Sequence, residues 1–186
     1  MLVGICGPKG SGKSFAADHL VAKGYARVRF ADPLKRMVSA LLHDMGISAL
    51  VVRQHVYGDL KDTPLGLEGM ESLTSRDLQV TLGTEWGRQI VDPDWWVKIA
   101  NLKVKKFLAD GRDVVIDDLR FENEARLING IGGRIIEINR PGHEYDASHP
   151  SEAGVPRKYI RSSADNHHKF ASSFYQEVTS LLTGMS

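Results

Sequence analysis

Residues 7–14 form a glycine-rich stretch of a kind that binds phosphate groups. They read Gly-Pro-Lys-Gly-Ser-Gly-Lys-Ser and match the pattern G-x-x-x-x-G-K-[ST]. In such a loop the backbone N–H groups turn toward phosphate oxygens, and Gly10, Ser11 and Gly12 are expected to do so here. Lys13 is expected to reach the outer phosphates, and Ser14 to hold Mg²⁺. The stretch therefore predicts a nucleotide site.

The sequence on either side of this loop supports the same interpretation. An apolar, strand-like run from Leu2 to Cys6 precedes it, and a helical stretch from Phe15 to Val21 follows it. A helix that begins at the loop places the partial positive charge of its N-terminus at the phosphates. The alternative, a chance glycine-rich turn, does not require these flanking elements.

A second candidate site lies where the apolar run Val114–Ile116 ends in Asp117 and Asp118. In proteins with such a phosphate loop, an acid at the end of a neighbouring strand orients magnesium, usually through water. We prefer Asp118 for this role and place Asp117 second. The alternative is that one carboxylate caps the helix expected to begin near Phe121.

Arg120 follows Asp118 by two residues, so it is expected to emerge at the same edge of the fold. A guanidinium fork fits phosphate oxygens better than an ammonium group does. Arg120 is therefore a candidate for binding the transferred phosphoryl group or an acceptor phosphate. Glu124, one helical turn further on, could steady it. A surface salt bridge between Arg120 and Glu124 is the alternative.

The spacing of apolar residues indicates the scaffold that must position these groups. Short strand-like runs alternate with segments of helical period, which predicts an α/β fold of three layers: a mostly parallel sheet of about five strands flanked by helices. The expected strands are Leu2–Cys6, Ala26–Phe30, Asp113–Asp117, Arg134–Ile138 and the more polar Tyr159–Ala164. Helices are expected to start near Lys13, Pro33, Ser75, Pro93, Phe121 and His168. Residues 45–73 show no sustained period and are predicted to be irregular.

Bulk properties restrict the partners of the chain. Its 186 residues correspond to one domain, and its net charge of +1 argues against a surface that binds nucleic acid. We expect no membrane role because no run of eighteen apolar residues occurs. The first residues do not form a secretory signal, so the cytoplasm is the expected compartment. The apolar face of the helix expected over 93–110 fits the core or a partner subunit, which leaves a homodimer open.

Further short segments follow the loop in a fixed order, and the ordered set is more specific than the loop alone. Together with the loop they resemble the phage-type deoxynucleoside monophosphate kinases, members of the P-loop nucleoside monophosphate kinase superfamily, over nearly the whole chain. The resemblance implies a P-loop kinase fold, Mg-ATP as phosphoryl donor, a deoxynucleoside monophosphate (dNMP) as acceptor and, for a phage-encoded protein, the host cytoplasm. The segments are Phe30–Lys35, Thr74–Gln79, Leu82–Arg88, Asp118–Glu124 and His149–Glu152.

The resemblance also implies roles for individual residues. Lys13 and Ser14 would serve the donor phosphates, and an insertion of about residues 33–110 would hold the acceptor. Asp32 could instead be an N-cap, and Gln79 could instead be an ordinary exposed helix residue. Arg76 and Arg88 lie in one predicted helical region, and one of them could have a structural role instead. The candidate acceptor residues are Asp32, Lys35, Arg76, Gln79, Arg88 and Arg120.

The polar segment of about residues 140–160 is expected to form a lid. It would exclude water from the phosphates and bring positive charge from Arg140, with Arg157 or Lys158 as further candidates. A surface loop with incidental charge is the alternative. The adenine of the donor is expected near the backbone of Asn166. Trp95-Trp96 could stack on a base, but its helical setting favours burial of at least one ring.

A monophosphate acceptor needs no general base, because its second pKa of about 6 leaves its oxygen deprotonated at neutral pH. Lys13, magnesium, Arg120 and a lid arginine would align the groups and stabilise charge in the transition state. One competing hypothesis is a P-loop kinase for a hydroxyl acceptor, a nucleoside or dephospho-coenzyme A, with Asp32 as base. Another is a non-kinase ATP-binding or ATPase module. A GTPase is disfavoured because no N-K-x-D tetrapeptide occurs.

Overall fold

A computed structural model of the chain describes residues 1–145, 154–167 and 171–183. The predicted segment His149–Glu152 and the helix start expected at His168 lie outside these ranges. The backbone divides into a unit of residues 1–30 and 97–186, called here the sheet unit, and a unit of residues 31–96, called the helical unit. Within the described ranges, no helix is both long and apolar enough to cross a bilayer.

The sheet unit is built on five strands that are all parallel, in the order β2-β3-β1-β4-β5. Because the strands are parallel, their carboxyl ends meet at one edge. Gly4 of β1 pairs with Ile116 of β3 on one side and Ile135 of β4 on the other, so the loop after β1 lies between two neighbours. The strands are β1 (Leu2–Cys6), β2 (Ala26–Val28), β3 (Val114–Ile116), β4 (Arg134–Asn139) and β5 (Ser162–Asp165).

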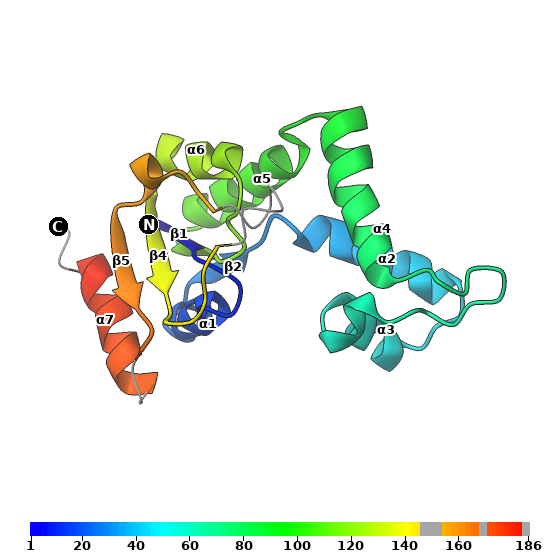
Figure 1. Cartoon of the computed structure of the whole chain (residues 1–186). Coiled ribbons are helices and arrows are strands. Elements are labelled where there is room, and N and C mark those ends of the chain that lie inside the picture. Colours follow the sequence, from blue (N-terminus) through cyan, green and yellow to red (C-terminus); the bar gives the residue numbers. More distant parts are fainter. Residues whose placement is uncertain (146–153, 168–170, 184–186) are drawn as a thin grey trace. The chain divides into compact units, whose positions relative to one another are not determined.

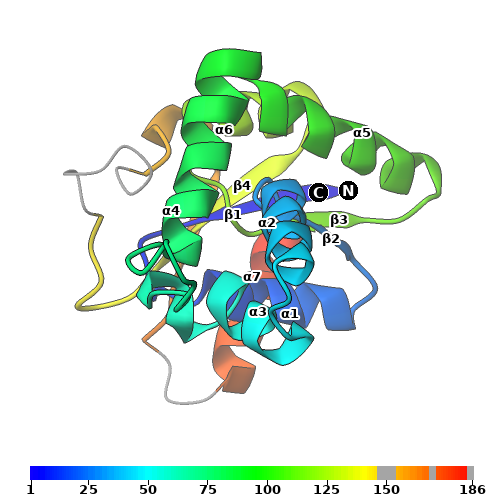
Figure 2. The same cartoon turned by 90° about the vertical axis from the view of Figure 1, so that its right-hand side faces the viewer.

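Helices cover both faces of this sheet (Figures 1 and 2). Helices α1 (Lys13–Ala22) and α7 (Ala171–Thr183) lie on one face, and α6 (Glu122–Gly130) with most of α5 (Trp95–Ala109) lies on the other. Side chains of β1 alternate between the two apolar clusters, as the period of a strand requires. The predicted three-layer α/β fold is confirmed.

The core of the sheet unit contains one face of helix α5 and the side chain of Cys6. Helix α5 buries Val97, Ala100 and Val104 in the sheet unit, so this apolar face serves the core of the chain itself. Burial raises the pKa of the Cys6 thiol to about 12, which keeps it protonated and unreactive at neutral pH. Because Val97, Ala100 and Val104 pack in this core, residues 97–109 belong to the sheet unit, although the acceptor insertion was expected to extend over about residues 33–110.

The helical unit has its own small core of Val38, Leu42, Val52 and Val56. Residues 45–73 were predicted to be irregular, and this prediction is wrong for eight of them, since Val52 and Val56 lie in a helix that buries them. Thr74 and Asp77 form a capping box, in which the side chain of each residue accepts a hydrogen bond from the backbone N–H of the other. The elements are α2 (Asp32–Asp44), α3 (Ala49–Val56), the 3-10 helix η1 (Asp59–Asp62), α4 (Ser75–Val80) and the π-helix η2 (Thr81–Val91).

The π-helix η2 is held by a tryptophan that packs against its glycines. Trp96 is buried, and its indole Nε1 donates a hydrogen bond of 2.8 Å to the carbonyl oxygen of Gly83. A Cβ atom on Gly87 would lie only 2.6 Å from the same Nε1 atom. The expectation that at least one ring of Trp95-Trp96 is buried is therefore confirmed, and Gly87 is needed for the close approach.

Replacing Gly87 by alanine is expected to destabilise the protein by about 1–3 kcal/mol, because the added methyl group displaces a buried ring. The measurement is the urea midpoint of unfolding followed by tryptophan fluorescence. Gly130→Ala is the control, since a Cβ there meets no atom within 4 Å. Equal midpoints for the two variants would contradict the packing described for Trp96.

Candidate functional site

The glycine-rich loop connects the carboxyl end of β1 to the start of α1. Gly7, Gly10 and Gly12 have φ values of 143°, 80° and 105°, which residues other than glycine rarely adopt. A Cβ atom on Gly7 would lie 2.3 Å from the carbonyl oxygen of Ile138. Lys13 is the first residue of α1, and its Nζ donates to the carbonyl oxygens of Gly7 and Pro8, each at 2.7 Å. The ammonium is thus held over the loop, and Ser14 lies in the first helical turn.

The two carboxylates after β3 have different surroundings. Asp117 is 3% exposed and accepts from Arg27 Nε and Nη2 at 3.1 and 2.5 Å, and from Arg29 Nε and Nη2 at 2.8 and 3.0 Å. Burial alone would raise the pKa of the Asp117 carboxyl, but the hydrogen bonds from Arg29 and Arg27 outweigh it and hold that pKa below its usual range. Asp117 is therefore an ionised anchor for two guanidinium groups.

Arg27 links Asp117 to the helix that follows the phosphate loop. Arg27 Nη2 donates to the backbone carbonyl of Ser14 at 3.1 Å, and Arg27 Nη1 pairs with Asp18 of α1 at 2.5 Å. Asp117 thus supports the first turn of α1 through Arg27. Sequence reasoning missed both arginines. The two arginines alternate with the buried residues Ala26, Val28 and Phe30, which is the ordinary pattern of a half-exposed strand, so no local signal pointed to their shared carboxylate.

Asp118 and Arg120 lie at the same edge. The half-buried Asp118 accepts the Phe30 N–H at Oδ1 over 3.0 Å. Glu124 is 2% exposed, and its Oε2 accepts the backbone N–H groups of Arg120 at 2.8 Å and Phe121 at 3.1 Å. The Glu124 carboxylate therefore fixes the backbone at Arg120, whose side chain is exposed.

Residues of the predicted lid lie close to the loop at one end. Arg140 Nη1 donates to the carbonyl oxygen of Gly10 at 3.1 Å. Arg157 lies 3.9 Å from Glu137, and Lys158 pairs with Glu122 of α6 at 2.8 Å. Among the described basic residues of the predicted lid, Arg140 is the one with a hydrogen bond to the phosphate loop. Closure of the lid stays a prediction.

A cavity of about 590 Å³ adjoins the loop on the side of β5. Phe15 of α1 is 42% exposed there and stacks on Tyr175 with ring centroids 4.8 Å apart. Asn166 was expected near the donor base, and it lines this cavity. Phe15 was not predicted, although an aromatic residue directly after the lysine and serine of the loop was a visible signal. The lining residues are Gly12, Phe15, Arg140, Pro141, Asn166 and His167.

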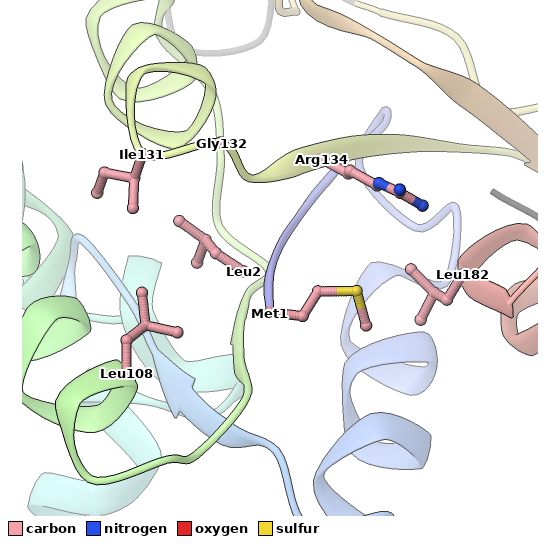
Figure 3. Close-up of a pocket in the computed structure, with 7 residues that line it drawn as sticks. All are labelled: Met1, Leu2, Leu108, Ile131, Gly132, Arg134 and Leu182. Atoms are coloured by element: carbon pink, nitrogen blue, oxygen red, sulfur yellow. The ribbon is translucent and has the colours of Figure 1, made fainter. Parts of the chain in front are cut away.

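A second cavity of about 520 Å³ lies at the opposite edge of the sheet. Figure 3 shows Leu2 facing Ile131 and Leu108, while Met1 and Arg134 lie toward Leu182. Leu2 and Arg134 begin strands whose other ends carry the phosphate loop and the lid. This cavity is therefore separate from the nucleotide site.

The candidate acceptor residues other than Arg120 all belong to the helical unit. The alternative role of Asp32 as an N-cap is wrong, because Ala31 is the N-cap and Asp32 lies in the first turn of α2. Gln79 is half-buried and donates to Ser75 Oγ at 2.9 Å, so it is not an ordinary exposed residue. The others have separate partners: Lys35 lies over the Tyr57 ring, Arg76 pairs with Asp62, and Arg88 donates to the Gly83 carbonyl.

A glycine-rich phosphate loop at the carboxyl edge of a parallel sheet, between two helical layers, defines a P-loop nucleotide-binding protein. The family model of deoxynucleotide monophosphate kinases matches residues 51–168. A protein of Acanthamoeba polyphaga mimivirus, provisionally named a deoxynucleotide monophosphate kinase, is 31% identical over 198 aligned positions, covering 100% of this chain and 98% of its own length. The chain belongs to the deoxynucleotide monophosphate kinase family, and the resemblance seen in the sequence is confirmed.

One further relative matches part of this chain, and one solved structure resembles it in fold alone. The deoxynucleoside-5'-monophosphate kinase of Escherichia phage T5 is 33% identical over 103 residues, which are 50% of this chain and 40% of the phage protein. A solved structure from Chloroflexus aurantiacus, provisionally described as a kinase, has a TM-score of 0.50 at 10% identity and covers 100% of this chain and 97% of that chain. This last likeness concerns the fold alone.

Proposed function

We propose that the chain transfers the γ-phosphoryl group of Mg-ATP to a deoxynucleoside 5'-monophosphate, giving a dNDP and ADP. The observation that carries this proposal is the geometry of the phosphate loop in a chain of this family. Lys13, the helix N-terminus and the glycine backbone converge where β1 ends. These groups stabilise the charge of a transferring phosphoryl group.

The donor nucleotide is assigned to the sheet unit. Its phosphates would lie on the loop, where phosphate oxygens replace the Gly7 and Pro8 carbonyls as partners of Lys13. Its base would enter the cavity beside Asn166, against the exposed ring of Phe15. Arg140 joins the two regions, since it lines that cavity and contacts Gly10.

The residues at the end of β3 and the start of α1 fit a magnesium ion. Ser14 and Asp118 offer a hydroxyl and a carboxylate, the hard oxygen ligands that Mg²⁺ prefers, partly through water. Asp118 is the preferred acid, and Asp117 is placed second because it is buried between two guanidinium groups. The ion would neutralise charge on the outer phosphates of the donor.

The acceptor is assigned to the residues that the family resemblance marks in the helical unit, together with Arg120. Lys35, Arg76 and Arg88 supply positive charge, Gln79 an amide, and Asp32 a carboxylate. An ionised phosphate oxygen of the acceptor attacks the γ-phosphorus as the bond to ADP breaks, and no protein base is needed. Arg120 stabilises the charge that this displacement spreads over the phosphoryl oxygens.

The proposal is tested by ADP release from Mg-ATP with each dNMP, each NMP, deoxynucleosides and no acceptor in parallel, with products identified chromatographically. Stimulation by dNMPs with formation of dNDPs is the expected result. Stimulation by unphosphorylated nucleosides would make Asp32 the candidate base of a kinase for hydroxyl acceptors. Equal ATP consumption with and without every acceptor would replace the kinase proposal by an ATPase.

A further inference from the structure

Three consecutive peptide carbonyls of the phosphate loop each accept a hydrogen bond from a side chain outside the loop. His143 Nδ1 lies 2.9 Å from the carbonyl oxygen of Lys9, Arg140 Nη1 3.1 Å from that of Gly10, and Asn166 Nδ2 2.8 Å from that of Ser11. All three side chains belong to the sheet unit. They come from two places more than 120 positions along the chain from the loop.

The glycines of the loop allow these contacts. A Cβ atom on Gly10 would lie 2.6 Å from the His143 ring, and one on Gly12 would lie 2.4 Å from Asn166 Nδ2. Both glycines have positive φ values and no side chain of their own to pack against the protein. Side chains outside the loop therefore help to hold its backbone conformation, in addition to the bonds from Lys13 to the Gly7 and Pro8 carbonyls.

Fixing a carbonyl also fixes the adjacent N–H group. A trans peptide is planar, with its C=O and N–H pointing in opposite directions. Bonds to the carbonyls of Lys9, Gly10 and Ser11 thus set the directions of the N–H groups of Gly10, Ser11 and Gly12, respectively. The Ser11 N–H donates to the Pro8 carbonyl at 3.2 Å, which helps to close the loop. Backbone N–H groups such as those of Gly10 and Gly12 are the part of a phosphate loop that binds the phosphates.

We propose that His143 is a positioning residue for the phosphate loop, acting with Arg140 and Asn166 as a collar that holds the loop in its ATP-binding form. The proposal rests on the ATP-donor part of the proposed function. Because a carbonyl oxygen only accepts, Nδ1 of His143 must carry the proton. His143 is itself placed by a short turn, in which its N–H donates to the Arg140 carbonyl at 3.0 Å.

The test separates the hydrogen bond from the bulk of the ring. His143→Ala removes both, His143→Phe keeps a ring against Gly10 without a donor, and His143→Gln keeps a side-chain N–H. ATP affinity is measured by calorimetry without any acceptor. Loss of one hydrogen bond in the loop is expected to weaken ATP binding roughly five- to tenfold in the Ala and Phe variants, with Gln closer to the unchanged protein.

A matched control is His43→Phe. The His43 Nδ1 also lies near a backbone carbonyl, that of Ile47 at 3.3 Å, but in the helical unit. It is expected to leave ATP affinity unchanged. The KM for the dNMP and the melting temperature of the His143 variants should match those of the control.

Two results would overturn the collar. One is ATP affinity within twofold of the unchanged protein in both the Ala and Phe variants. The other is an equal loss in ATP affinity, dNMP affinity and melting temperature, which would make His143 only a turn residue. Because binding is measured without acceptor, a protein that binds ATP but transfers nothing to a dNMP would refute the proposed function and leave the collar intact.

Discussion

Replacing Arg120 by alanine is expected to lower kcat about a thousandfold, the size of effect seen when an arginine that stabilises a transferring phosphoryl group is removed. The KM for ATP is expected to change little, because the phosphate loop and Lys13 are untouched. The fold should persist, since the side chain is exposed and the backbone N–H remains bound to Glu124. The measurement is steady-state kinetics of dNDP formation, with melting temperature alongside.

Two companion variants make the result specific to Arg120. Arg120→Lys keeps the charge but not the planar fork, so an intermediate loss of kcat is expected. Arg126→Ala removes another exposed arginine of the same region and should leave kcat unchanged. If Arg120→Ala retained a third or more of kcat, the arginine would have no part in transfer.

Several elements were predictable because their signals are local. The loop at residues 7–14, the strand before it and the helix after it depend on neighbouring residues, and β1 begins and ends where expected. The capping box at Thr74 and Asp77 is equally local, with its partners three residues apart. Helix α3 was missed because its eight residues are too few for a sustained period.

The supports of the site were not predictable for a different reason. Asp117 meets its arginines across 88 and 90 positions, and Asn166 meets Ser11 across 155. Such contacts follow from strand order, since β2 pairs with β3 and β5 with β4, and a single sequence does not state that order. The π-helix is likewise set by tertiary packing, because Trp96 binds the carbonyl of Gly83 from thirteen positions away.

Replacing Asp117 by alanine is expected to destabilise the protein by about 3–5 kcal/mol, the usual result of removing one partner from a buried ion pair. Both Arg27 and Arg29 would lose their shared carboxylate, and their side chains are only 21% and 29% exposed. The measurement is the free energy of unfolding in urea. Since Arg27 also binds the Ser14 carbonyl, the molecules that stay folded are expected to show a raised KM for ATP.

Asp113→Ala is the matched control at the other end of the same strand. The Asp113 side chain is 44% exposed and pairs with the terminal amine of Met1, so its loss is expected to cost under about 1 kcal/mol. The comparison also decides between the two carboxylates at the end of β3. A small loss of stability in Asp117→Ala, joined to a large rise in the Mg²⁺ concentration needed for half-maximal activity, would move the metal from Asp118 to Asp117. A large loss of stability, with that Mg²⁺ concentration unchanged, would show that Asp117 acts through its arginines and leaves the metal to its neighbour.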